Sequence, residues 1–290
     1  MIHVLYNPIA GGGAGEANAR AIEKLFPNEK CAFYDVRPTN LSALTRSLGK
    51  DDRVILAGGD GTLNHFVNRL PVLPDGVPFY YYAAGSGNDF LRDVESDANG
   101  LVPLNAYIER LPTVTVRGKT RRFLNGVGYG IDGYCCEEGD RLREKGKKNI
   151  NYAAIAIKGL LGKFKSREAT VEVDGEVKSY RNVWLAPVMN GRFYGGGMMI
   201  APNQDRLNGE RTVSVVVLHC RSKLKTLIAF PGIFKGEHVR RTDMVEIRTG
   251  RRIVVEFDRP TPLQIDGETV TDVRKYAVTA AEPAVREQIA

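Results

Sequence analysis

The feature that most constrains this chain is a glycine-rich segment at residues 56–64, Leu-Ala-Gly-Gly-Asp-Gly-Thr-Leu-Asn. An apolar run precedes it, and a helix-like stretch at residues 65–70 follows. Such a strand, turn and helix start form an anion cradle, because glycines let the backbone approach a phosphate and the helix N-terminus presents unpaired N–H groups. Asp60 places a carboxylate in this cradle, which indicates that it binds a metal ion or transfers a proton. A simple helix cap is the alternative.

A second glycine turn, at residues 85–89, follows an apolar run that holds three consecutive tyrosines. Strand-like runs alternate with helix-like stretches in this N-terminal part, which predicts an α/β fold with a doubly wound, mostly parallel sheet. Ligands of such sheets bind beyond the carboxyl ends of the strands. Both glycine turns follow strands, so the chain order directs them to one cleft. The predicted strands are residues 2–6, 33–36, 54–57 and 78–83.

Beyond residue 112 the pattern changes to β-branched and period-2 runs, which predict a β-sandwich. Asp174-Gly175 is typical of a hairpin turn. Helices are expected only at residues 149–164 and 222–230. We therefore predict an α/β domain at residues 1–112 and a β-rich domain at residues 113–274. The predicted strands of the second domain are residues 113–116, 169–173, 182–188, 212–218, 244–248 and 252–257.

Charge and composition limit the classes of partner. The net charge of +7 over 290 residues suits nucleotide phosphates or an acidic membrane surface. Nucleic acid is disfavoured, because the basic residues are not interleaved with stacking aromatic residues. No apolar run reaches the roughly 18–20 residues of a membrane span, and residues 1–6 lack the features of a signal peptide. The four cysteines show no zinc-binding spacing. We expect a reduced, cytoplasmic protein.

Two further motifs accompany the glycine turns: Val-Leu-Tyr-Asn-Pro, followed by a glycine loop, at residues 4–15, and Leu-Gln-Ile-Asp-Gly-Glu at residues 263–268. In this order and spacing the four motifs resemble the diacylglycerol kinase catalytic family, in its bacterial soluble lipid kinase branch. Gly-Gly-Asp-Gly-Thr alone is shared with NAD kinases and phosphofructokinases, so the resemblance rests on the whole set. It implies that the domain at residues 1–112 is the nucleotide-binding domain, that the domain at residues 113–274 binds the lipid substrate, and that residues 275–290 return to the first domain.

The resemblance implies an ATP-dependent lipid kinase that uses Mg²⁺ and phosphorylates a hydroxyl of a membrane lipid such as diacylglycerol. Ser86 stands where the family usually has threonine, which keeps a hydroxyl in the nucleotide pocket. Thr39 matches a nucleotide-contacting hydroxyl of the family, although Thr39 or Asn40 also fits a helix cap. The nucleotide-binding residues implied by the resemblance are Asn7, Thr39, Gly58, Gly59, Asp60, Gly61, Thr62, Asn64, Gly85, Ser86 and Asn88.

Four positions are candidates for catalysis or metal binding through carboxylates. The resemblance implies that Asp60 organises a metal–water network and that Glu268 is the general base. Residues 266–268 and 174–176 are both Asp-Gly-Glu, so this tripeptide alone indicates only a hairpin turn; the preceding Leu-Gln-Ile and the family position favour Glu268. Asp89 and Asp132 are the further metal candidates.

A structural Mg²⁺ site of the family is doubtful in this chain. The family has an Asn-Asp-Gly turn there, whereas this chain has Leu207-Asn208-Gly209. Asn208 keeps an oxygen ligand but loses a charge, which weakens the binding of a hard cation.

Two other functions stay open at this stage: an NAD kinase-like enzyme and a nucleotide-binding regulator without activity. The identity of the lipid also stays open, as does the oligomeric state, for which a homodimer is considered. A kinase with a bilayer-resident substrate must dock on the bilayer, so we expect peripheral contact with an anionic membrane. Two basic stretches flank apolar segments and suit this role, residues 141–148 (including Lys145, Lys147 and Lys148) and residues 221–241.

Overall fold

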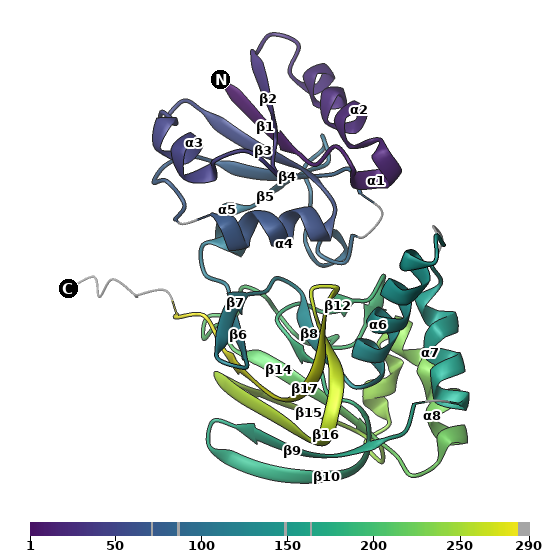
Figure 1. The fold of residues 1–290 in the computed structure, drawn as a ribbon. Coiled ribbons are helices and arrows are strands. Elements are labelled where there is room, and N and C mark those ends of the chain that lie inside the picture. The colour runs from purple at the N-terminus through teal and green to yellow at the C-terminus, as the bar shows by residue number, and fades with distance from the viewer. Residues whose placement is uncertain (71, 86–87, 148–149, 163, 284–290) are drawn as a thin grey trace, which may run out of the picture. The chain divides into compact units, whose positions relative to one another are not determined.

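The chain folds into two compact units, Met1–Arg110 and Leu111–Ala290. The computed structural model (Figure 1) describes residues 1–70, 72–85, 88–147, 150–162 and 164–283. The observed division lies two residues before the predicted domain boundary. An apolar core lies within each unit.

The first unit is built on a five-stranded sheet with the order β2-β1-β3-β4-β5. All neighbours run parallel except β4 and β5. The central strands β1 and β3 are almost wholly buried, which explains why most of their residues are apolar. This is the predicted α/β architecture. The strands are β1 (Ile2–Tyr6), β2 (Cys31–Asp35), β3 (Arg53–Gly58), β4 (Phe79–Ala83) and β5 (Leu101–Pro103).

Helices connect these strands, and their starts follow local capping chemistry. Asn40 caps the helix after β2, because its side chain accepts a hydrogen bond of 3.1 Å from the backbone N–H of Ala43. The cap is therefore Asn40 and not Thr39. The helix after β3 begins at Asp60, directly behind Gly59. The helical segments are α1 (Ala10–Gly13), α2 (Gly15–Arg20), η1 (Ala21–Leu25), α3 (Leu41–Ser47), α4 (Asp60–Arg69), η2 (Leu91–Asp93) and α5 (Asn105–Ile108).

The second unit holds a ten-stranded sheet with the order β7-β6-β17-β16-β8-β11-β14-β10-β9, in which β15 pairs with β14. The sheet curls back on itself, because β9 also pairs with β16. Tyr129 stacks on Phe257 at 4.0 Å and meets Tyr276 edge-on within the core. The strands are β6 (Thr113–Val116), β7 (Lys119–Arg122), β8 (Gly126–Tyr129), β9 (Arg167–Val173), β10 (Glu176–Leu185), β11 (Val188–Met189), β14 (Val213–His219), β15 (Val245–Gly250), β16 (Arg252–Ile265) and β17 (Glu268–Thr279), with a separate pair β12 (Phe193–Tyr194) and β13 (Met198–Met199).

The C-terminal segment differs from the prediction that residues 275–290 return to the first domain. Its described part continues β17, which pairs with β16 and β6 inside the second unit. Tyr276 and Val278 are at most 1% exposed there. Burial of these two side chains in the second core holds the segment in place. Residues 284–290 lie outside the described part of the chain.

Three helices lie together on one side of the second unit (Figure 1): α6 (Ile131–Glu144), α7 (Tyr152–Leu161) and α8 (Lys223–Ala229). The predicted helices at 149–164 and 222–230 correspond to α7 and α8, whereas α6 was not predicted. Asn151 and Ser222 cap α7 and α8. Among the described residues, no helix is both long and apolar enough to cross a bilayer. Short 3₁₀ segments, η3 (Phe230–Lys235) and η4 (Glu237–Arg240), follow α8.

Candidate functional site

Asp60 joins the two glycine turns of the first unit. Its carboxylate oxygens accept hydrogen bonds from the backbone N–H groups of Asp89, at 2.7 Å, and Phe90, at 3.1 Å. The side chain thus acts across the turn and does not cap its own helix, for which no side-chain cap is present. The predicted convergence of the two turns is therefore present in the fold, and an acidic group lies at its centre.

Close backbone packing explains why these turns need glycine. A Cβ at Gly85 would lie 2.6 Å from the Cα of Gly59, and a Cβ at Gly58 would lie 2.5 Å from the Cβ of Thr62. The first glycine loop and α2 join the same cluster: the amide of Asn18, in α2, donates a hydrogen bond of 3.2 Å to the carbonyl of Ala84. A Cβ at Gly11 would lie 3.1 Å from that carbonyl oxygen. Three loops thus meet at the carboxyl ends of the strands.

The outer side of this cluster is open. A Cβ added at Gly12, Gly13 or Gly61 would meet nothing within 4 Å. The first two of these, with φ of 73° and 99°, adopt a backbone conformation that other residues rarely take. The side-chain oxygen of Asn88 is buried and has no hydrogen-bond partner in the part of the chain that the structure describes. Bare backbone and an unsatisfied oxygen fit a phosphate ligand and its counter-ion.

The other predicted nucleotide-binding residues differ in how open they are. Asn64 is 2% exposed and its oxygen accepts a hydrogen bond from Asn68, so its side chain supports α4. The hydroxyl of Thr39 donates to the carbonyl of Asp35 at 2.6 Å. The oxygen of Asn7 accepts from the backbone N–H of Ile9 at 3.2 Å. Ser86 lies outside the described residues.

The Asp266 turn is anchored in the second unit. The Asp266 carboxylate accepts hydrogen bonds from three consecutive backbone N–H groups: those of Leu124 at 2.6 Å, Asn125 at 2.8 Å and Gly126 at 3.1 Å. Three donors to one carboxylate hold this turn firmly, because charge-assisted hydrogen bonds are stronger than neutral ones. These hydrogen bonds fix the position of the hairpin that carries Glu268.

A buried polar network lies beneath this turn. The guanidinium of Arg206, 6% exposed, donates to the carbonyl of Leu124 at 2.6 Å and to the side-chain oxygen of Asn125 at 2.5 Å. The amide of Asn190 donates to the same Leu124 carbonyl at 2.8 Å. Sequence reasoning missed both residues. Nothing in the local sequence separates Arg206 from exposed arginines, because its role depends on contacts more than 80 positions away along the chain.

Glu268 itself is accessible. Its side chain is 57% exposed and forms an ion pair with Arg121 on β7. Arg121 also donates to the carbonyl of Ile265 at 3.3 Å. Arg121 is half-buried, whereas the Glu268 carboxylate is open to a hydroxyl group that approaches the turn.

Asp132 is the buried carboxylate of the second unit. It lies in the first turn of α6 and is 6% exposed. Burial raises the pKa of Asp132 to about 7, while the nearby hydroxyl of Tyr194 acts in the opposite direction. A Cβ at Gly128 would lie 2.7 Å from an Asp132 oxygen and 2.5 Å from the amide nitrogen of Gln264. Asp132 therefore lies close to the strand that leads into the Asp266 turn.

The structure gives Asn208 a role within its own loop. Its oxygen accepts from the backbone N–H and the hydroxyl of Thr212, at 2.9 and 3.1 Å, and its nitrogen donates to the carbonyl of Asp205 at 2.6 Å. The amide oxygen is thus already engaged. Among the described residues, no three His, Cys, Asp or Glu side chains are grouped to hold a metal ion. Asp60 and Asp89 remain the neighbouring acidic residues at the glycine turns.

Comparisons with known proteins agree with this arrangement. The family described as "Diacylglycerol kinase catalytic domain" matches residues 1–118, and the one described as "YegS C-terminal NAD kinase beta sandwich-like domain" matches residues 125–285. The chain is 27% identical to a diacylglycerol kinase of Mycobacterium tuberculosis (strain CDC 1551 / Oshkosh), over 89% of this chain and 85% of that protein. It is 24% identical to a diacylglycerol kinase of Bacillus subtilis (strain 168), over 91% and 88%.

The fold is also found in a solved structure. A crystal structure of a diacylglycerol kinase from Bacillus anthracis str. Sterne superposes with a TM-score of 0.61, at 18% identity, over 97% of this chain and 94% of that one. The family match and the named relatives define the chain as a two-domain kinase, a phosphotransferase. The chain belongs to the diacylglycerol kinase catalytic family, with a C-terminal domain of the YegS type.

Proposed function

We propose that this protein is an ATP-dependent lipid kinase that transfers the γ-phosphate to a hydroxyl group of a membrane lipid, with diacylglycerol as the first candidate. The observation that carries the proposal is the Asp60 carboxylate, which bridges the glycine turns beside open glycine backbone. The names of the relatives support the substrate class.

The first unit supplies the phosphate-binding part of the reaction. Backbone N–H groups of the glycine turns, together with the N-terminus of α4, offer donors and a positive dipole end to the phosphates of ATP. Asp60 holds the second turn in register and, with Asp89 and the unsatisfied oxygen of Asn88, presents oxygen atoms of the kind Mg²⁺ prefers. A bound Mg²⁺ would neutralise charge that develops on the phosphates.

The second unit supplies the base. Glu268 accepts the proton of the lipid hydroxyl. The hydroxyl oxygen forms a bond to the γ-phosphorus, and the bond from that phosphorus to the bridging oxygen of ADP breaks. Asp266 positions Glu268 through its three backbone hydrogen bonds, and the half-buried Arg121 yields the Glu268 carboxylate to the lipid hydroxyl. Orientation of this kind is the main contribution a kinase makes.

Labelled ATP tests the proposal directly. The purified protein is incubated with [γ-³²P]ATP and mixed micelles of detergent and diacylglycerol, and separately with NAD. We expect labelled phosphatidic acid, no labelled NADP, and loss of the product in Asp60→Asn. Label on NAD would favour the NAD kinase-like alternative. No transfer to any alcohol in a total lipid extract, with ATP still bound, would favour the inactive regulator.

A further inference from the structure

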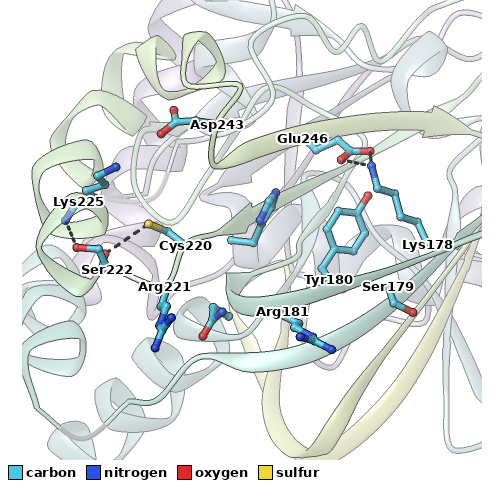
Figure 2. Close-up of a pocket in the computed structure, with 12 residues that line it drawn as sticks. Lys178, Ser179, Tyr180, Arg181, Cys220, Arg221, Ser222, Lys225, Asp243 and Glu246 are labelled. Carbon is cyan, nitrogen blue, oxygen red and sulfur yellow. Dashed lines mark hydrogen bonds and ion pairs between the residues drawn. The ribbon is translucent and has the colours of Figure 1, made fainter.

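A pocket of about 540 Å³ lined by polar residues lies in the second unit, between the middle of β10, the end of β14, the start of β15 and the start of α8. Figure 2 shows its lining. Lys178 contacts Glu246 on one side of the pocket, and Arg181 and Arg221 extend toward the opposite side. Neither the glycine turns nor the Asp266 hairpin contributes to it. The lining residues are Lys178, Ser179, Tyr180, Arg181, Asn182, His219, Cys220, Arg221, Ser222, Lys225, Asp243 and Glu246.

Positive charge exceeds negative charge in this pocket. The Lys178 ammonium contacts both oxygens of Glu246, at 2.9 and 2.7 Å. Asp243 is paired at 3.2 Å with Arg241, which lies beside the pocket. Both carboxylates of the lining are thus neutralised. Arg181, Arg221 and Lys225 add three further cations that form no ion pair within the described residues. An anion with several oxygen atoms, such as a phosphate, complements this charge.

The pocket is built on rigid backbone. Tyr180 and Val183 flank a bulge in β10, and Asn182 within it has a φ of 56°. The backbone N–H of Cys220 donates to the carbonyl of Asn182 at 2.9 Å. The indole of Trp184 in turn donates to the Cys220 carbonyl at 2.8 Å. These bonds fix the backbone beside Arg181, in β10, and Arg221, just after β14, so the two cations are anchored close together before any ligand arrives.

Apolar side chains next to the pocket indicate where its anion comes from. Lys225 of α8 lines the pocket, while Leu224 and Ile228 on the same helix are each 67% exposed. Leu161 at the end of the adjoining α7 is 64% exposed, and Phe234 in η3 is 38% exposed. Exposed large apolar residues beside cations are typical of a surface that enters the headgroup region of a bilayer.

The other basic stretch is less suited to this role. Arg141 and Arg143 on α6 are paired with Glu138 at 2.6 Å and Asp140 at 2.7 Å. Lys148 and Lys163 lie outside the described residues. We place the predicted membrane contact on residues 221–241, where pocket cations and exposed apolar side chains occur together.

We propose that this pocket binds the phosphate of an anionic phospholipid headgroup while Leu224 and Ile228 of α8 enter the bilayer. The proposal extends the proposed lipid kinase function by giving its membrane contact a specific headgroup site. Each cation near an anionic leaflet strengthens attachment by about fivefold. Arg181 and Arg221 together therefore account for about 25-fold of the affinity for anionic vesicles.

Vesicle co-sedimentation tests the site with a matched control. The full chain is mixed with vesicles of phosphatidylcholine alone or with phosphatidylglycerol. We expect Arg181→Glu/Arg221→Glu to weaken binding to the anionic vesicles by at least about 25-fold. Lys119→Glu/Arg274→Glu, which reverses two exposed cations on β7 and β17, changes the net charge equally and should cost much less. Equal losses in the two variants would overturn the pocket and leave only a general surface charge.

Two further measurements separate the sources of the phosphate and the two proposals. Leu224→Ser/Ile228→Ser should weaken binding to both kinds of vesicle, because it removes apolar insertion. The fluorescence of Trp184, the single tryptophan of the sequence, should change little with free inorganic phosphate. Tight binding of free phosphate would overturn the lipid assignment. Phosphorylation of a short-chain, soluble diacylglycerol should be unchanged in Arg181→Glu/Arg221→Glu, so failure of the kinase function and failure of this site are distinguishable.

Discussion

The two Asp-Gly-Glu hairpins of the second unit share their residues and their backbone shape. The aspartate and glycine have φ of 49° and 89° at residues 174–175, and of 46° and 90° at residues 266–267. In both hairpins the carboxylate also ties down a neighbouring segment. Asp174 accepts from the backbone N–H groups of Arg251 and Arg252, and Asp266 accepts from those of residues 124–126. The two turns therefore have the same local conformation and the same kind of carboxylate hydrogen bonds.

Their surroundings differ. The segment held by Asp266 continues into the buried network of Arg206 and Asn190, whereas the segment held by Asp174 is the partly exposed turn from β15 into β16. Gln264, two residues before Asp266, is 3% exposed and accepts from the backbone N–H of Gly267 at 2.7 Å. Its counterpart Glu172 forms a surface ion pair with Arg252. The Asp-Gly-Glu tripeptide therefore specifies a turn, while the buried residues beneath it determine whether the turn can orient a reacting group.

The largest difference is expected between the two glutamates. Glu268→Gln removes the proposed base and should slow turnover by about 10²–10⁴-fold, the range for general acid–base catalysis. Glu176→Gln alters a side chain that is 83% exposed and should leave turnover unchanged. Initial rates at saturating ATP measure both variants. Equal losses would mean that the assay reports stability and that the hairpins are not functionally different.

The next difference concerns stability. Asp266→Ala leaves three backbone N–H groups without their charged acceptor and should lower the free energy of unfolding by about 3 kcal/mol. Asp174→Ala removes a more exposed acceptor and should cost about 1 kcal/mol. Urea unfolding followed by circular dichroism gives both values. A cost for Asp174→Ala as large as that for Asp266→Ala would contradict the role of the buried network.

A third difference is expected in pH dependence. The folded pKa of Asp132, near Gln264, is raised to about 7, above its ordinary value of about 4. The folded state therefore binds this proton more tightly, so its stabilisation is complete below about pH 4 and is lost as pH rises toward 7. Asp132→Asn should remove this loss between about pH 4 and 7. Thermal unfolding across that range, in buffer with a metal chelator, measures it; an unchanged pH profile would contradict the buried-carboxylate assignment.

The smallest difference is expected two residues before each turn. Gln264→Ala removes the acceptor for the Gly267 N–H and should cost about 1 kcal/mol, with a several-fold decrease in turnover as Glu268 loses its orientation. Glu172→Ala should change neither quantity by much, because exposed ion pairs contribute little. Unfolding and rate measurements on the same preparations provide the check. A normal rate in a destabilised Gln264→Ala would separate orientation from stability.

Much of the first unit was predictable because its signals are local. Alternation of apolar runs with helix-like stretches predicted the parallel sheet, and the confirmed strand β1 spans the predicted residues 2–6. The helix cap at Asn40 was predictable because it depends on a hydrogen bond within a few residues. In the second unit the Asp174-Gly175 turn was predictable for a similar reason, since it depends on the φ preferences of two residues. The convergence of the glycine turns followed from strand direction alone.

The sequence by itself thus determined the fold class, the glycine turns and both hairpins, since each depends on neighbouring residues. Only the tertiary structure decided the rest. Helix α6 was missed because its glycines weaken helix propensity, yet Gly133 is required where a Cβ would lie 1.9 Å from the Pro262 carbonyl. The burial of Arg206 and the path of β17 likewise arise from contacts between distant segments. Such contacts follow from packing free energy summed over a whole core, which no short motif encodes.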